Sequence, residues 1–153
     1  MDAEESESPI LELFVYLCVR DAAAAIEFYQ AAFGAREILR LQEPGGRIMH
    51  AELKLGPALV MLAEELPEYG IRSPQAFGGT GTTIHLNVRG LDGLAARAVA
   101  AGATMIRKPA NEDHGERQCR LRDPFGHEWL LGQELEKISS EEIQRRFESQ
   151  FRR

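Results

Sequence analysis

The sequence predicts an α+β fold built from two tandem copies of one strand–helix–strand–strand–strand unit. VYLCVRDAAAAIEFYQAAFGA (15–35) is similar to IHLNVRGLDGLAARAVAAGA (84–103): each has an alternating apolar run, a polar cap and a helical pattern that ends at glycine. Equivalent positions, such as Val19 and Val88, are 68 to 70 residues apart. A repeat this regular predicts two copies of one unit of about 70 residues.

In the first copy, LFVYLCV alternates and predicts a strand. Asp21 then provides an N-cap for a helix whose apolar positions, including Tyr29 and Phe33, recur at helical spacing. Gly34 stands where a helix ends with a left-handed residue. The runs EILRL, RIMHAELKL and ALVML predict the three strands that complete the unit.

In the second copy, TIHLNV predicts the first strand, and Asp92 is the expected N-cap of a helix that ends at Gly102. The strands TMIRK, RQCRLR and HEWLLG follow. Between the copies, ELPEYGIRSPQAFGGTG is rich in Gly and Pro and predicts a loop without a regular element.

The predicted domain boundaries follow from these elements. We expect a disordered acidic tail (1–9), one domain (10–138) and a C-terminal helix (139–153). Within the domain, module one spans 10–64, the linker 65–81 and module two 82–134.

The C-terminal helix has strong start signals. Ser139 and Glu142 predict a capping box, and Ile138 faces Ile143 as a hydrophobic staple. The apolar stripe from Ile143 through Phe147 to Phe151 predicts that this helix packs against the domain or against a second subunit.

Composition excludes several classes of protein. The net charge of −6 argues against a nucleic-acid partner, because phosphate neutralisation needs a basic surface. No apolar run is long enough to span a membrane, and the acidic N-terminus does not resemble a signal peptide, so we expect a cytoplasmic protein. Cys18 and Cys119 are too few for a disulfide framework and are expected to be reduced thiols.

Taken in order, these motifs resemble those of the vicinal oxygen chelate superfamily, which contains glyoxalases, bleomycin-resistance proteins, fosfomycin-resistance enzymes and dioxygenases. GRIMHAEL, GGTGTTIHLNV, AVAAGA and DPFGHEW are similar to the PhnB-like branch. The resemblance covers about residues 10 to 134. It implies two βαβββ modules whose strands curve into an open barrel around a cleft, helices on the outer faces, and a homodimer.

Alternation along the strands predicts which side chains face that cleft. Ile48 lies two residues before His50 and is therefore expected to face the cleft with it. The repeat aligns His50 with Arg120 at an offset of 70. His127 is interpreted as a turn or packing residue, and His114 as an exposed loop residue. The predicted ligand-binding residues are Phe14, Tyr16, His50, Glu52, Thr83, His85, Asn87, Arg120 and Glu128.

Metal-dependent members of the superfamily carry ligands on the first and last strand of each module. The resemblance places these positions at Phe14, Val60, Thr83 and Leu130, none of which is a His or a carboxylate. We therefore expect no metal and no cofactor. The alternative is a displaced Zn, Fe or Mn site, with ligands from His50, Glu52, His85 and Glu128.

Three functions remain open. The first is a metal-free protein that binds a small organic ligand in the cleft, as bleomycin-resistance proteins do; its aromatic and polar lining suits a ligand pocket. The second is a metal-dependent lyase, isomerase or dioxygenase that uses the displaced site. The third is a metal-free enzyme with His85 or Glu52 as general base. Catalytic residues are not identified from the sequence.

Overall fold

The computed structural model describes residues 8–152. Module one forms a four-stranded sheet in the order β1-β4-β3-β2, in which β1 is parallel to β4 and the other neighbours are antiparallel. Its elements are β1 (Val15–Val19), α2 (Ala22–Phe33), β2 (Arg36–Gln42), β3 (Ile48–Leu55) and β4 (Ala58–Glu64).

Module two repeats this topology in a second sheet, ordered β5-β8-β7-β6, with β5 parallel to β8. The predicted α+β fold of two βαβββ modules and a C-terminal helix is confirmed. Within residues 8–152 the two sheets are open and form no closed barrel. The elements are β5 (Thr83–Asn87), α4 (Leu91–Ala101), β6 (Thr104–Asn111), β7 (Glu116–Arg122) and β8 (Glu128–Glu134).

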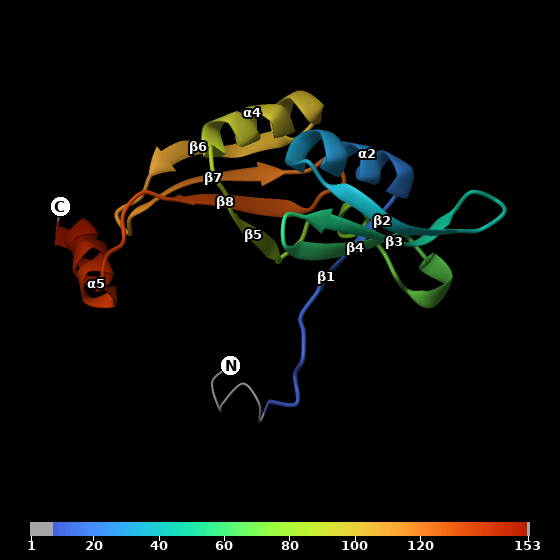
Figure 1. Ribbon diagram of the computed structural model, residues 1–153, viewed down its shortest axis with the longest axis horizontal. Coiled ribbons are helices and arrows are strands. Elements are labelled where there is room, and N and C mark those ends of the chain that lie inside the picture. The colour runs from blue at the N-terminus through green and yellow to red at the C-terminus, as the bar shows by residue number, and fades with distance from the viewer. Residues whose placement is uncertain (1–7, 153) are drawn as a thin grey trace.

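Figure 1 shows helices α2 and α4 side by side on one face of the two sheets. Residues 8–14 extend away on the opposite side, and the C-terminal helix lies beyond one end of the sheet of module two. The predicted tail falls largely on residues 1–7, which lie outside the described residues. No helix among residues 8–152 is long and apolar enough to cross a membrane.

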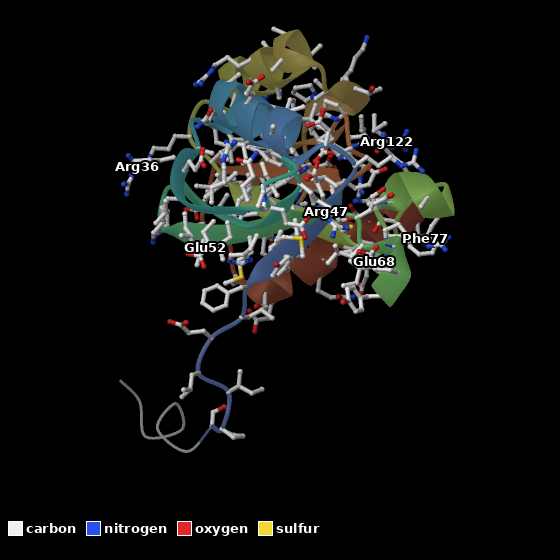
Figure 2. The ribbon with its side chains drawn as sticks, turned by 90° about the vertical axis from the view of Figure 1, so that its right-hand side faces the viewer. Arg36, Arg47, Glu52, Glu68, Phe77 and Arg122 are labelled. Atoms are coloured by element: carbon white, nitrogen blue, oxygen red, sulfur yellow. The ribbon has the colours of Figure 1, made fainter. Side chains whose placement is uncertain are left out.

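The linker contains two short helices, so the prediction that it lacks regular elements was wrong. These are η1 (Pro67–Tyr69) and α3 (Pro74–Phe77); each begins at a proline, whose fixed φ suits the first helical turn, and ends before a glycine. Arg47, just before β3, donates to Glu68 of η1 at 2.8 Å (Figure 2) and holds the linker against module one.

Both predicted caps of α2 are confirmed, whereas in α4 the predicted C-terminal Gly102 is confirmed and the predicted N-cap, Asp92, is wrong. Asp21 accepts a hydrogen bond from the Ala24 amide at 3.0 Å, as expected of an N-cap. In α4 the N-cap is Gly90, and Asp92 lies inside the first turn. Its carboxylate instead accepts from Arg117 of β7 at 2.8 Å, because the guanidinium is within reach across the module.

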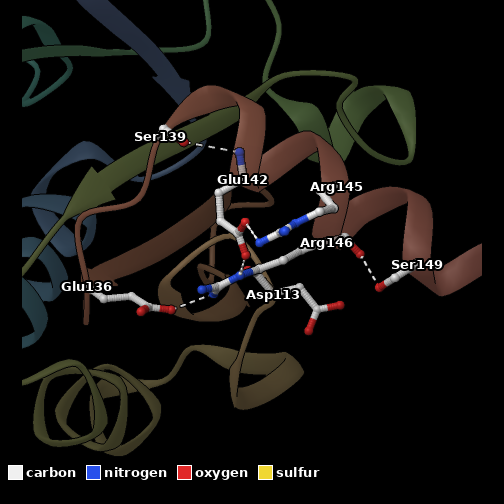
Figure 3. Close-up of polar contacts among 7 residues, drawn as sticks. All are labelled: Asp113, Glu136, Ser139, Glu142, Arg145, Arg146 and Ser149. Carbon is white, nitrogen blue, oxygen red and sulfur yellow. Dashed lines mark hydrogen bonds and ion pairs between the residues drawn. The ribbon is translucent and has the colours of Figure 1, made fainter.

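The C-terminal helix α5 (Ser140–Ser149), followed by η2 (Gln150–Arg152), has half of the predicted capping box. The Ser139 hydroxyl accepts from the Glu142 amide, but the Glu142 carboxylate pairs with Arg145 and Arg146 (Figure 3). Arg146 also donates to Glu136, so polar contacts orient a helix that buries none of its residues.

The turn before β8 joins the two modules. Asp123 is 4% exposed, and its carboxylate accepts from the Tyr29 hydroxyl of α2 at 2.5 Å and from Trp129 Nε1 of β8 at 2.9 Å. The backbone amides of Phe125 and His127 donate to its other oxygen. His127 also bonds to the carbonyl of Cys18 in β1 at 2.9 Å, which agrees with its interpretation as a turn residue.

We expect Tyr29→Phe to lower the free energy of unfolding by about 1.5–3 kcal/mol, because it removes one donor from a buried, charged acceptor. Urea denaturation measures the change. Tyr69→Phe is the matched control: this exposed residue should change stability by less than about 0.5 kcal/mol. If the two substitutions changed the free energy of unfolding equally, the hydrogen bond to Asp123 would not stabilise the junction between the modules.

Candidate functional site

The strand register shows which residues lie on the face of each sheet opposite the helices, which we call its concave face. In module one, Tyr16 of β1 pairs with Met61 of β4, which pairs with Glu52 of β3. Residues paired directly across strands share a face. In module two the equivalent row is His85, Leu130 and Arg120.

This register corrects two alignments made from the sequence. Glu52, and not His50, is equivalent to Arg120, because both stand in these rows; His50 corresponds to Gln118. Val60 is buried in the core, so the concave position in β4 is Met61. The offset is 69 residues between β1 and β5 and between β4 and β8, but 68 between β3 and β7, so a single offset of 70 misaligns these strands.

Ile48 also departs from the expected cleft-facing pattern. Its side chain is 1% exposed and belongs to the hydrophobic core. The β2–β3 ladder has a register shift between Leu41 and Gln42, next to the pairing with Ile48, so simple alternation fails at this end of β3.

A chain of polar groups lies on the concave face of module one. The Tyr16 hydroxyl is 2.7 Å from His50 Nδ1, and His50 Nε2 is 3.1 Å from a Glu52 oxygen. Burial raises the pKa of Tyr16, with smaller contributions from Cys18 and Glu52, so the phenol is held in its neutral form. The sequence places these three residues on one face; the hydrogen bonds between them emerge only in the structure.

In module two, Glu128 is surrounded by cations. Arg122 Nε donates to it at 3.0 Å, and Arg120 lies 3.8 Å away. Arg120 also donates to the Thr83 hydroxyl at 3.0 Å. Arg122 and Glu128 therefore neutralise each other, and the structure does not bring Glu128 together with the histidines predicted to share a metal site with it.

The absence of a side chain at Gly132 lets three polar groups converge on the concave face. A Cβ there would stand 2.7 Å from His85 Nε2, 3.0 Å from a Glu116 oxygen and 3.6 Å from Asn87 Oδ1. Glu116 was missed from the sequence, although it shares the parity of Gln118, which donates to it at 2.8 Å.

His114 lies beside this group of residues. Its Nε2 is 3.1 Å from Gln118 Nε2 and 3.5 Å from a Glu116 oxygen, so it contacts the concave face rather than standing free in a loop.

A pocket of about 470 Å³ lies between the modules and brings four of the predicted ligand residues together. This volume falls within the range of small-molecule sites. His50, Glu52, Asn87, Arg120 and Glu128 do not line it. The lining combines apolar, hydroxyl and imidazole groups, including Leu13, Phe14, Tyr16, Thr83, His85 and His127.

The usual metal positions do not suit a divalent ion. With Met61 in place of Val60, the four positions are Phe14, Met61, Thr83 and Leu130. Their side chains end in a phenyl ring, a thioether, a hydroxyl and an isobutyl group, respectively. Such a set offers a hard or borderline cation only one oxygen. Across residues 8–152, no three His, Cys, Asp or Glu side chains are grouped so as to hold an ion.

The Glyoxalase/Bleomycin resistance protein/Dioxygenase superfamily model matches residues 11–131. The uncharacterized protein Rv0887c of Mycobacterium tuberculosis is 41% identical over 138 residues, which are 88% of this chain and 81% of that protein.

Two solved structures illustrate the fold similarity. TioX from Micromonospora sp. ML1 is 28% identical with a TM-score of 0.64, over 84% of this chain and all (100%) of TioX. FosX from Listeria monocytogenes, solved with Mn(II) and a sulfate ion, is 19% identical with a TM-score of 0.63, over 92% of this chain and 98% of FosX. At that identity the likeness to FosX is one of fold alone.

We expect Gly132→Ala to displace the His85 ring, because the added methyl group would overlap its Nε2. The free energy of unfolding should change by no more than about 0.5 kcal/mol, since the ring belongs to a side chain that can move. Histidine NMR shifts report the displacement. Gly81→Ala is the control, with nothing within 4 Å of the added methyl. An unchanged His85 signal in Gly132→Ala would show that the ring does not lie over Gly132.

Proposed function

The chain belongs to the Glyoxalase/Bleomycin resistance protein/Dioxygenase superfamily, and we propose that it is a metal-free binding protein for a small organic ligand. The observation that carries this proposal is the pocket between the modules, with Phe14, Tyr16, Thr83 and His85 in its lining. Aromatic walls with a few polar groups are typical of sites that hold organic molecules. The residues at the usual metal positions support binding without an ion.

The chemistry of the lining favours a partly aromatic ligand that carries hydrogen-bonding groups. Phe14 offers a ring for stacking, and Thr83 and His85 offer hydrogen bonds from module two. His50, Glu52, Asn87, Arg120 and Glu128, on the two concave faces, are proposed to form a wider polar surround. The motifs GRIMHAEL and DPFGHEW favour the PhnB-like branch.

A thermal-shift screen of aromatic metabolites and antibiotics tests the binding proposal, because a ligand that binds only the folded state raises its melting temperature. For a confirmed ligand, we expect Phe14→Ala to weaken binding about tenfold, which corresponds to about 1.4 kcal/mol. Phe77→Ala is the control, since this exposed ring on α3 does not line the pocket (Figure 2).

Metal analysis separates this proposal from a metalloenzyme. We expect ligand affinity to be unchanged after dialysis against a chelator. A stoichiometric ion whose removal abolishes ligand binding would instead establish the metal-dependent function.

We also propose that the protein is a homodimer. Two apolar surfaces of the single chain project away from its core: the N-terminal segment, where Leu13 is 93% exposed, and the stripe on α5 and η2, where Phe147 is 52% and Phe151 75% exposed. A ten-residue helix is marginal in water without tertiary packing. Covering both surfaces with a second copy would stabilise them.

For a homodimer, light scattering should give twice the 17.1 kDa of one chain. We expect Phe147→Ser to shift the protein toward monomer, because it removes an aromatic side chain from the α5 stripe. Arg145→Ser on the same helix, at a largely exposed charged position, should leave the mass unchanged. A wild-type protein of single-chain mass would reject the dimer.

A further inference from the structure

Three side chains on the concave face of module one are arranged in the order nucleophile, base and orienting group. We propose that Tyr16, His50 and Glu52 form a proton relay that makes the Tyr16 oxygen a nucleophile toward the carbonyl carbon of a small aryl ester. The hydroxyl of Tyr16 is 2.7 Å from His50 Nδ1, and His50 Nε2 is 3.1 Å from Glu52. A nucleophile within hydrogen-bond reach of a base that a third group orients is the arrangement by which enzymes activate weak nucleophiles.

The contact with Glu52 determines where the proton on His50 lies. An ionised carboxylate can only accept, so His50 Nε2 carries the proton that is donated to Glu52. The Nδ1 lone pair of the neutral ring then faces Tyr16 and accepts its hydroxyl proton. The base is therefore held in the tautomer that this relay requires.

Backbone register fixes the three positions. His50 and Glu52 are two residues apart on β3 and so share a face. Tyr16 reaches His50 from β1, across the intervening strand β4. The side chains of His50 and Glu52 are only 21% and 25% exposed, whereas Tyr16 is about half-exposed (55%) and lines the pocket. The base and its partner are thus sheltered, and the phenol is accessible to a ligand.

Activation has to come from His50, because the resting phenol is neutral. Burial raises the pKa of Tyr16, so little phenolate is present near neutral pH. Burial also raises the pKa of the nearby Cys18 thiol, with a further contribution from Glu65, so a thiolate does not compete on this strand. Transfer of the phenolic proton to His50 during attack supplies the missing nucleophilicity.

The step balances without an oxidant or a cofactor. A bond forms between the Tyr16 oxygen and the acyl carbon, and the bond from that carbon to the leaving oxygen breaks. The phenolic proton moves to His50 Nδ1, whose positive charge Glu52 stabilises, and is then released to the leaving aryloxide or to solvent. The product is an acyl-tyrosine. This proposal deepens the proposed ligand site, since Tyr16 belongs to the pocket.

4-Nitrophenyl acetate tests the relay on the full-length chain without knowledge of the natural ligand. Release of nitrophenolate gives the rate, and peptide mass spectrometry locates the acetyl group. We expect Tyr16 to be acetylated at least about tenfold faster than Tyr69, an exposed tyrosine outside the pocket, as general-base assistance commonly contributes more than this. His50→Gln should lower the Tyr16 rate to that of Tyr69.

Glu52 is a positioning residue, and its test uses a spectroscopic readout. Nitrogen-15 NMR of the wild-type protein should show neutral His50 protonated at Nε2. Glu52→Leu, which offers no acceptor, should remove that preference and slow Tyr16 acetylation, while circular dichroism shows an unchanged fold. Acetylation of Tyr16 no faster than of Tyr69, an unchanged Tyr16 rate in folded His50→Gln, or wild-type His50 protonated at Nδ1 would each overturn the relay. Ligand binding in the thermal-shift screen together with an inert Tyr16 would reject the relay alone.

Discussion

The buried carboxylate of Asp123 is the constraint on which the arrangement of the two modules depends. It accepts hydrogen bonds from Tyr29 of module one and from Trp129 of module two, so a single side chain ties α2 to β8. Aromatic rings surround this contact: Tyr29 and Phe33 both pack against Trp129, and Phe28 packs against Phe125. A buried charge of this kind is tolerated only when donors satisfy it. Because the pocket takes residues from both modules, its shape follows from this junction.

The sequence was sufficient to predict the fold and the face that most side chains occupy. Strand alternation and helix spacing depend on short-range geometry, and the repeat supplies the topology. For this reason Tyr16, His50 and Glu52 could be assigned to one face. The register between strands is a long-range property, which local patterns do not contain. Hence Arg120 was paired with the wrong residue of module one, and the bulge beside Ile48 was not expected.

The site was less predictable because its organisation depends on contacts between strands. Parity assigned Glu128 to the concave face but could not reveal that Arg122 and Arg120 neutralise it. Nor did it identify Glu116, which becomes relevant only because Gly132, on the neighbouring strand, leaves space for His85 and Asn87. Local sequence patterns also do not indicate the role of Asp123, since its partner Tyr29 lies 94 positions earlier in the chain.

The two concave faces differ chemically, and Gly132 is one of the positions at which they differ. Gly132 occupies the position that Ala63 holds in module one, where the neighbouring β1 residue is Cys18. Two similar backbones therefore carry different side chains. The face of module one carries the phenol of Tyr16 next to the imidazole of His50 and the carboxylate of Glu52, whereas in module two the imidazole of His85 lies over Gly132. A molecule that spans both faces meets a different environment at each end. The internal symmetry of the fold therefore does not extend to recognition, and head-to-tail reversal of such a molecule would give a distinguishable complex.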